Sequence, residues 1–141
     1  MDINKLTDAA ELAKAIPHAQ ALGMSFVEIG QGHAIMQLPY DEKLIGDPQT
    51  GVIHGGAVFA LMDTCAGAAV MSHPDAKGYT ATIDLRVDYM RSATPGQTLR
   101  TRADCYRYGR SVAFVRAVAY DEDEARPVAV ANGAFVASKG E

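Results

Sequence analysis

The feature that most constrains this chain is the stretch GVIHGGAVFALMDTCAGAAV, which runs from Gly51 to Val70. After His54 and two glycines it is apolar nearly all the way round, and one carboxylate, Asp63, sits in its middle. A helix that is apolar on every side has to be covered on every side. We therefore expect a helix over about 55–72 that other elements surround, with an acid among apolar neighbours.

The segments on either side of this helix have the patterns of β-strands. Residues 24–40 predict two strands joined by a turn at 30–32, and 41–53 is expected to be a loop because it carries glycines and a proline. Residues 79–90 alternate strictly, with one face made of Ile83, Leu85, Val87 and Tyr89 and the other of Asp84, Arg86 and Asp88. Further strands are expected over 97–108, 111–120 and 127–138.

This order of elements predicts an α+β fold formed by one domain over residues 1–141. Residues 1–23 would be an N-terminal helical segment, which Pro17 interrupts. The long helix would lie in the concave face of an antiparallel sheet, and four strands would follow it as a meander. Small helix residues would let the strands approach closely, namely Ala60, Ala66, Gly67, Ala68 and Ala69.

Composition excludes several classes of function. The apolar fraction of 48% excludes a disordered chain, and the net charge of −4 without a basic block argues against nucleic acid as a partner. The N-terminus has no signal-peptide pattern, and the apolar run 57–71 is too short to cross a membrane. We expect a cytoplasmic protein with two buried thiols, Cys65 and Cys105. No metal site is expected, because metal-ligand spacing is lacking among His18, His33, His54 and His73.

The start of the long helix has the features of an oxyanion hole, which is a set of N–H donors that binds a carbonyl oxygen. The first N–H groups of a helix have no internal partner and carry the positive end of the helix dipole. Glycines at 55 and 56 leave room for a ligand oxygen to reach these donors. The alternative is that Gly55 and Gly56 only permit a tight turn beneath a strand.

Asp63 is the second candidate catalytic residue. Its neighbours on the helix surface, among them Phe59, Ala60 and Gly67, cannot pair with a charge. Burying a carboxylate without a partner costs several kcal/mol or raises its pKa, so such an acid is more often functional than a surface acid. The alternative is that Asp63 faces a solvent channel or caps a nearby loop.

The spacing of these two candidates predicts a shared site. Gly55 and Asp63 are eight residues apart, or about 12 Å of helix. A general base and an oxyanion hole must both lie about 3 Å from the same carbonyl group. One helix therefore cannot supply both, and we expect Gly55 of one subunit to meet Asp63 of another across a two-fold axis.

The same residues resemble a known family. The stretch GVIHGGAVFALMDT, with an acid nine residues after the histidine, is similar to the hotdog-fold thioesterases, and most of all to their PaaI-like acyl-CoA thioesterase branch. The similarity covers roughly 24–138 and includes IDLRVDYMRSATPG and YRYGRSVAFVRAVAYDE. It implies a long helix wrapped by an antiparallel sheet, a homodimer joined edge to edge, and often a dimer of dimers.

The resemblance also implies roles for individual residues. Gly55 would give its N–H to the thioester carbonyl, and Asp63 would activate water or attack directly. His54 would position the loop and the helix start, although a purely structural histidine explains it as well. Where relatives carry Asn or Gln six residues before the histidine, this chain has Pro48, and the adjacent Gln49 is the candidate substitute.

Thr82 corresponds to a family Ser or Thr that would orient the water. Strand alternation places Thr82 on the side of Asp84 and Arg86 rather than on that of Ile83 and Leu85. Three outcomes stay open at this point: the strand bends there, Thr82 faces the partner subunit, or the correspondence fails.

Coenzyme A, as part of the substrate, would need cations for its phosphates and an apolar surface for its adenine. The resemblance places this surface at the end of the strand after the helix and at the next hairpin. Arg91, Arg107 and Arg110 are the phosphate candidates, with ordinary surface arginines as the alternative. The expected substrate-binding set consists of these three arginines and seven further residues: Gly56, Tyr89, Met90, Ser92, Tyr108, Gly109 and Ser111.

The expected activity is hydrolysis of an acyl-CoA to a carboxylic acid and free CoA, without a metal or other cofactor. Two alternatives stay open. The first is a hydratase or dehydratase on acyl thioesters, which needs a His–acid pair for proton shuttling, and His54 with Asp63 could be misread as such a pair. The second is an acyl-CoA-binding module without turnover.

Overall fold

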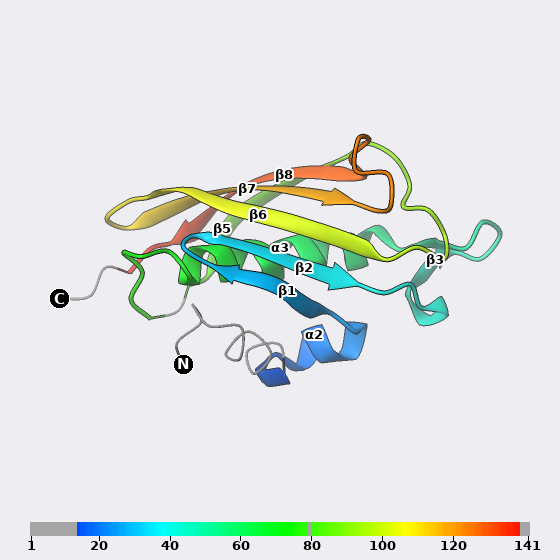
Figure 1. Ribbon diagram of the computed structural model, residues 1–141, viewed down its shortest axis with the longest axis horizontal. Coiled ribbons are helices and arrows are strands. Elements are labelled where there is room, and N and C mark those ends of the chain that lie inside the picture. Colours follow the sequence, from blue (N-terminus) through cyan, green and yellow to red (C-terminus); the bar gives the residue numbers. More distant parts are fainter. Residues whose placement is uncertain (1–13, 79, 139–141) are drawn as a thin grey trace.

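The computed structural model describes residues 14–78 and 80–138. Two helices, one 3-10 turn and eight strands are assigned within these ranges (Figure 1). In chain order they are α2 Pro17–Leu22, β1 Ser25–Gly30, β2 His33–Leu38, η1 Glu42–Leu44, β3 Ile45–Asp47, β4 Val52–Ile53, α3 Gly55–Met71, β5 Thr82–Tyr89, β6 Leu99–Tyr108, β7 Val112–Tyr120 and β8 Ala129–Val136.

Six strands form one antiparallel sheet in the order β1-β2-β6-β7-β8-β5. The strand that follows the long helix, β5, pairs with β8 and not with β6. The expected meander of four strands is therefore wrong; three strands form a meander and β5 lies at the sheet edge. Alternation tells which way side chains point but not which strand is the neighbour, and the loop 90–98 carries the chain from one edge of the sheet into its interior.

The helix α3 lies against one face of this sheet (Figure 1), as the sequence predicts. The expectation that other elements surround it on every side is not met within one chain, since Phe59 is 39% exposed. The packing of α3 is mainly against β6, β2 and β7. Several of the buried strand residues are small, among them four alanines at 103, 113, 117 and 119. Nine helix residues are buried, among them Leu61, Met62 and Cys65, which are fully inaccessible. The core thus lies between α3 and the sheet, where apolar burial stabilises the fold.

The segment expected to be a loop, 41–53, contains a 3-10 turn and the small hairpin β3–β4. The hairpin returns the chain to His54, whose backbone N–H donates to the carbonyl of Leu44 at 2.7 Å. Gly46 lies so close to this point that a Cβ there would be 2.8 Å from the Cα of His54. Glycine is therefore needed at position 46, and the hairpin fixes where α3 begins.

The first residues of β5 depart from strict alternation. The pairing register with β8 shifts between Thr82 and Asp84, which is a β-bulge. The expected buried face does not include Ile83, whose side chain is 56% exposed. Of the three outcomes left open for Thr82, the structure shows the first, because the strand is irregular there.

The smaller features predicted from the sequence, a hairpin, two buried thiols and an N-terminal helix, can also be compared with the structure. The hairpin at 30–32 and the buried thiols of Cys65 and Cys105 are confirmed. Pro17 is the first residue of α2, a position that suits proline, so it starts a helix; residues 1–13 of the expected N-terminal segment lie outside the described residues. Of the two described ranges, neither contains a helix of the length and apolarity that crossing a membrane needs.

Candidate active site

The N-terminus of α3 is capped by His54. This residue has φ −61° and ψ 137°, and its Nδ1 accepts a hydrogen bond from the N–H of Gly56 at 2.8 Å. Its carbonyl accepts from the N–H of Ala57 at 3.0 Å. An N-cap side chain of this kind satisfies one of the orphan donors of the first turn. The Nδ1 atom is thus an acceptor in this arrangement.

The expectation that the N–H of Gly56 binds the substrate does not agree with the structure. That donor is used by His54, and a Cβ on Gly56 would lie 2.8 Å from the same Nδ1. The glycine is needed because the histidine ring occupies the space of its side chain. Within the described residues, the N–H of Gly55 has no acceptor in the chain. Gly55 is the donor at this helix start that stays available to a ligand.

Tyr89, at the end of β5, fixes the first peptide of the helix from the other side. Its hydroxyl donates to the carbonyl of Gly55 at 2.7 Å. Burial raises the pKa of this phenol, so it stays a donor. A cavity of about 350 Å³ adjoins this contact and includes Gly55 together with Tyr89, Met90, Arg91 and Ser92. The structure thus brings together the first half of the expected substrate-binding set.

For Arg91, the structure does not agree with the expected role as a phosphate ligand. Its Nη1 and Nη2 atoms donate to the two carboxylate oxygens of Asp121 at 2.7 and 2.8 Å, and further donors reach the carbonyls of Ser92 and Arg126. The side chain of Asp121 is 1% exposed, and the guanidinium holds the pKa of this carboxyl well below its usual range. Arg91 is therefore engaged in a bidentate ion pair that pins the loop after β5, and its donors are not free for a phosphate.

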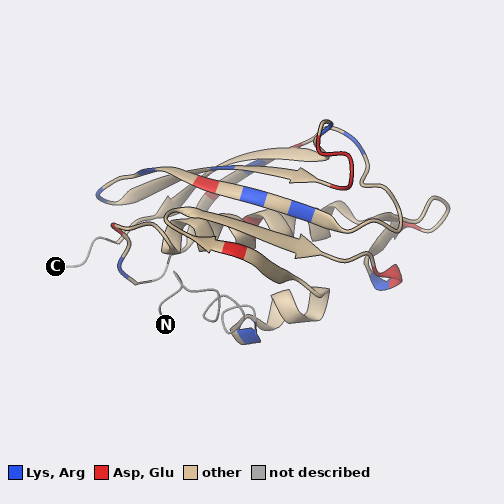
Figure 2. Cartoon of the chain, viewed as in Figure 1, with Lys and Arg blue, Asp and Glu red and all other residues tan. Residues whose placement is uncertain are grey.

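The second half of the substrate-binding set lies elsewhere. Arg107, Tyr108, Gly109, Arg110 and Ser111 form the end of β6 and the turn into β7. Tyr108 stacks on His73, just beyond the C-terminus of α3, with ring centroids 5.0 Å apart. Arg107 and Arg110 are exposed. The turn from β6 to β7 lies at the opposite end of the sheet from the loop after β5, and Figure 2 shows blue segments, the colour of Lys and Arg, at that tip. One chain therefore does not unite the two halves.

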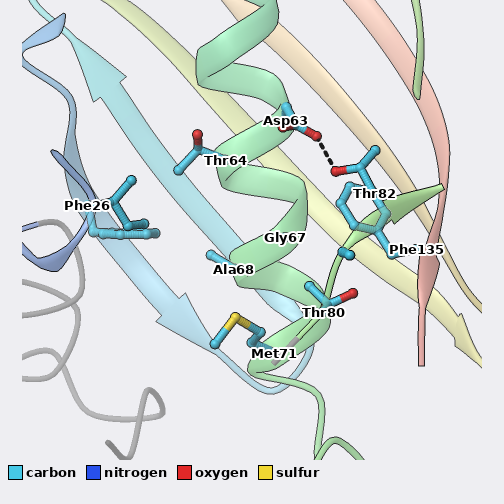
Figure 3. Close-up of a pocket in the computed structure, with 11 residues that line it drawn as sticks. Phe26, Asp63, Thr64, Gly67, Ala68, Met71, Thr80, Thr82 and Phe135 are labelled. Carbon is cyan, nitrogen blue, oxygen red and sulfur yellow. Dashed lines mark hydrogen bonds between the residues drawn. The ribbon is translucent and has the colours of Figure 1, made fainter. Parts of the chain in front are cut away.

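Asp63 lies on α3 and faces the start of β5 (Figure 3). The hydroxyl of Thr82 donates to its Oδ1 at 2.7 Å. The carboxylate is half-buried in this chain and has a polar partner, which corrects the expectation of a buried, unpaired acid. The bulge in β5 makes the contact possible because it turns Thr82 toward the helix.

A cavity of about 200 Å³ opens beside this pair. Figure 3 shows Asp63 and Thr82 at one end of it, with Gly67 in the middle and Met71 a further turn along the helix. Sequence reasoning missed this cavity, since its walls come from distant parts of the chain: α3, β1, β8 and the start of β5 with the residues before it. The available signal was Gly67, which costs a helix interior roughly 1 kcal/mol relative to alanine.

Gln49 lies at the exposed tip of the β3–β4 hairpin, where its backbone N–H donates to Asp47 Oδ1 at 3.0 Å. It lines neither of the two cavities that hold Gly55 and Asp63. Those cavities are themselves separate, because the two candidates are eight positions apart on α3, about 12 Å along the axis. Each chain thus presents a donor half and an acid half that do not meet within it.

The sequence also matches known proteins. The family model described as the thioesterase superfamily matches residues 50–128, which include α3, β5, β6 and β7. The chain belongs to the thioesterase superfamily. One relative, a protein from Halobacterium salinarum that carries an esterase name, is 37% identical over 123 residues, with 81% of this chain and 80% of the relative covered.

A further relative and two solved structures are also similar to this chain. A medium/long-chain acyl-CoA thioesterase of Escherichia coli is 25% identical over 122 residues and is matched over 77% of this chain and 78% of its own. A crystal structure from Pseudomonas aeruginosa has a TM-score of 0.81 at 37% identity, with 93% and 97% of the two chains covered. The PaaI protein of E. coli has a TM-score of 0.82 at 20% identity, covering 96% and 98%, which shows the fold. The expected hotdog fold of this thioesterase-superfamily chain is confirmed.

Proposed function

We propose that this thioesterase-superfamily protein hydrolyses an acyl-CoA thioester to a carboxylic acid and free CoA, with Asp63 as the catalytic acid–base group. The observation that carries the proposal is the Thr82–Asp63 hydrogen bond of 2.7 Å at the mouth of a cavity in a family of thioester hydrolases. The named acyl-CoA thioesterase among its relatives supports coenzyme A as the thiol carrier.

The chemistry follows from the partners of Asp63. Thr82 occupies Oδ1, and within the described residues Oδ2 accepts no hydrogen bond, so it is available to take a proton from water. The water oxygen then bonds to the carbonyl carbon while the carbonyl oxygen becomes an oxyanion. A Gly55 N–H stabilises that oxyanion. Its collapse breaks the carbon–sulfur bond, and the proton held by Asp63 goes to the leaving thiolate. In direct attack, Oδ2 of Asp63 bonds to the carbonyl carbon and the carbon–sulfur bond breaks, which releases the thiolate. Water then cleaves the resulting anhydride, which gives the carboxylic acid and restores the Asp63 carboxylate, and the second proton of the water passes to the thiolate.

The two halves of the site are completed by a second copy of the chain. The start of the edge strand β5 adjoins the Asp63 cavity and its end adjoins the Gly55 cavity, through Thr82 and Tyr89 respectively. Antiparallel pairing of β5 with a two-fold copy sets the start of one strand against the end of the other. Such pairing would bring each Asp63 cavity next to the partner's Gly55.

The surface around this edge has the character of an interface. Large apolar side chains are exposed there, with fractions of 56% for Ile83, 51% for Tyr89 and 60% for Met90. Phe59, on the exposed part of α3, adds a further 39% exposed side chain. An unpaired sheet edge with apolar flanks is a site of association that proteins otherwise avoid exposing. We infer a homodimer with two shared sites.

The hydratase alternative needs a histidine paired with the acid. Within one chain His54 lies nine residues before Asp63, and its Nδ1 already accepts from the N–H of Gly56. A second copy that brings Gly55 to Asp63 would bring its His54 as well, so an assay for hydration of crotonyl-CoA has to separate the two activities. Within residues 14–78 and 80–138 no histidine lines the Asp63 cavity. No specific observation favours a binding module without turnover.

The direct experiment measures release of free thiol from acyl-CoA by the wild type and by Asp63→Asn. We expect wild-type turnover and a fall in kcat of about 10²–10⁴-fold in the variant, since general acid–base catalysis contributes that much. Asn keeps the size of the side chain, so the oligomer and the melting temperature should be retained. Unchanged turnover in Asp63→Asn, or hydration of crotonyl-CoA in place of thiol release, would overturn the proposal.

A further inference from the structure

The cavity beside Asp63 changes in character from one end to the other (Figure 3). Its polar end holds the carboxylate and the hydroxyl of Thr82, and its other lining residues near β1 and the helix end are Phe26, Met71 and Ile16. Along α3, Gly67 lies about 6 Å and Met71 about 12 Å beyond Asp63. A molecule bound here would place a reacting polar group at Asp63 and hydrocarbon across Gly67.

Gly67 lines this cavity between its two ends, and a Cβ added at this position would not clash with its neighbours. A Cβ at position 67 would lie 3.8 Å from Thr80 Cγ2 and 3.9 Å from Phe135 Cε2, which are ordinary contact distances. By contrast, a Cβ on Gly56 or Gly46 would meet its neighbours at 2.8 Å. Alanine would fit at position 67 and would stabilise the helix. What glycine provides at this position is empty space, and that space belongs to the cavity.

The direction of the missing side chain is also informative. Thr80 and Phe135, the nearest neighbours of a Cβ at position 67, are themselves lining residues of the cavity. A side chain at this position would therefore grow into the cavity and separate its polar end from Met71 and Phe26. Position 67 is placed to limit how much hydrocarbon can follow a carbonyl bound at Asp63.

We propose that Gly67 is the specificity-determining residue of this enzyme, and that its substrates are thioesters whose acyl group extends past Gly67 to contact Met71 and Phe26. This inference rests on the proposed function, because it takes the acyl group as the occupant of the cavity. The volume of about 200 Å³ suits such an occupant, since a 150 Å³ apolar cavity is known to hold a benzene ring. Acetyl esters would leave the apolar end empty and would be poor substrates.

The test compares kcat/KM for acetyl-, butyryl-, hexanoyl- and octanoyl-CoA in the wild type and in Gly67→Ala and Gly67→Leu. For the wild type we expect kcat/KM to rise by about fourfold per buried methylene, the change that corresponds to 0.8 kcal/mol, until the cavity is filled. Gly67→Leu should lower kcat/KM for octanoyl-CoA by about tenfold or more and leave acetyl-CoA within about twofold. Gly67→Ala should give an intermediate shift with a melting temperature raised by a few degrees.

Met71→Ala is the matched variant with the opposite effect on cavity length. It removes side-chain volume from the far end of the same cavity, whereas the Gly67 variants add it. It should move the optimum toward longer acyl chains. The inference is overturned if the Gly67 variants lower kcat/KM equally for all chain lengths, or if they leave the chain-length profile unchanged. Failure of the proposed function looks different: the wild type would then release thiol from none of the four esters.

Discussion

At the level of single residues, Gly55 allows the donor and the side chain to be tested separately. Proline at this position removes the N–H that we propose binds the carbonyl oxygen. It is compatible with the first helical position, and His54 already has the extended conformation, φ −61° and ψ 137°, that a residue before proline prefers. Alanine keeps the N–H, and its methyl group would meet the Tyr89 ring at an ordinary 3.5 Å.

We expect Gly55→Pro to lower kcat by about 10²–10³-fold, as loss of one oxyanion-hole donor does, with the fold retained. Gly55→Ala should stay within a few-fold of the wild type. Steady-state thiol release and thermal unfolding of both variants check this. Equal activity of the proline and alanine variants would mean that this N–H does not contact the substrate.

The candidate site residues could be predicted from the sequence to different degrees. Asp63 stood out because it is an acid within an apolar helix, and Gly55 because a glycine pair begins that helix. The partner of Asp63 could not be derived from alternation, because the bulge at Thr82 reverses which way that side chain points. Arg91 was mistaken for a phosphate ligand because its partner, Asp121, lies 30 residues away and looks like part of an acidic turn.

At the level of elements, the ion pair between Arg91 and Asp121 joins the loop after β5 to the turn after β7. Asp121 also accepts from the N–H and the hydroxyl of Thr94, at 3.1 and 2.9 Å. The folded-state pKa of this carboxyl lies below its unfolded value, which is near 4. Its contribution to stability is therefore fully present above about pH 4 and is lost as the pH falls through the folded-state pKa.

For Asp121→Asn we expect the free energy of unfolding at pH 7 to fall by about 3 kcal/mol, because an arginine is left without its carboxylate. The difference from the wild type should shrink as the pH drops below about 4. Urea unfolding at several pH values measures both. Asp123→Asn is the control on the same turn, since its partner is the exposed Arg126, and it should cost no more than about 0.5 kcal/mol. A pH-independent difference for Asp121→Asn would contradict the assignment.

The elements themselves follow closely from the sequence, while their arrangement does not. The expected helix at 55–72 is observed as Gly55–Met71, and the expected strand at 111–120 as Val112–Tyr120. For the strand this information lies in the alternation of apolar and polar residues, and for the helix it lies in the long, nearly unbroken apolar run that follows two glycines. The pairing of β5 with β8 depends on contacts between distant parts of the chain, which no local pattern encodes.

At the level of the whole molecule, the separation of the donor half from the acid half is the central observation. Gly55 and Asp63 line different cavities, and the edge strand β5 runs from one to the other. A two-fold copy paired along this edge would supply what each cavity lacks. The account thus depends on catalysis by two protomers together, with neither complete alone.

The most direct test of this claim mixes two inactive variants. Asp63→Asn and Gly55→Pro are co-expressed with different affinity tags, the mixed dimer is isolated, and thiol release is measured. In a mixed dimer, one site combines the intact Gly55 of one chain with the intact Asp63 of the other, while the second site carries both defects. The account predicts that the mixed dimer recovers about half of the wild-type kcat per dimer, whereas each variant alone stays inactive. A mixed dimer as inactive as its parents would show that donor and acid act within one chain and would contradict the account.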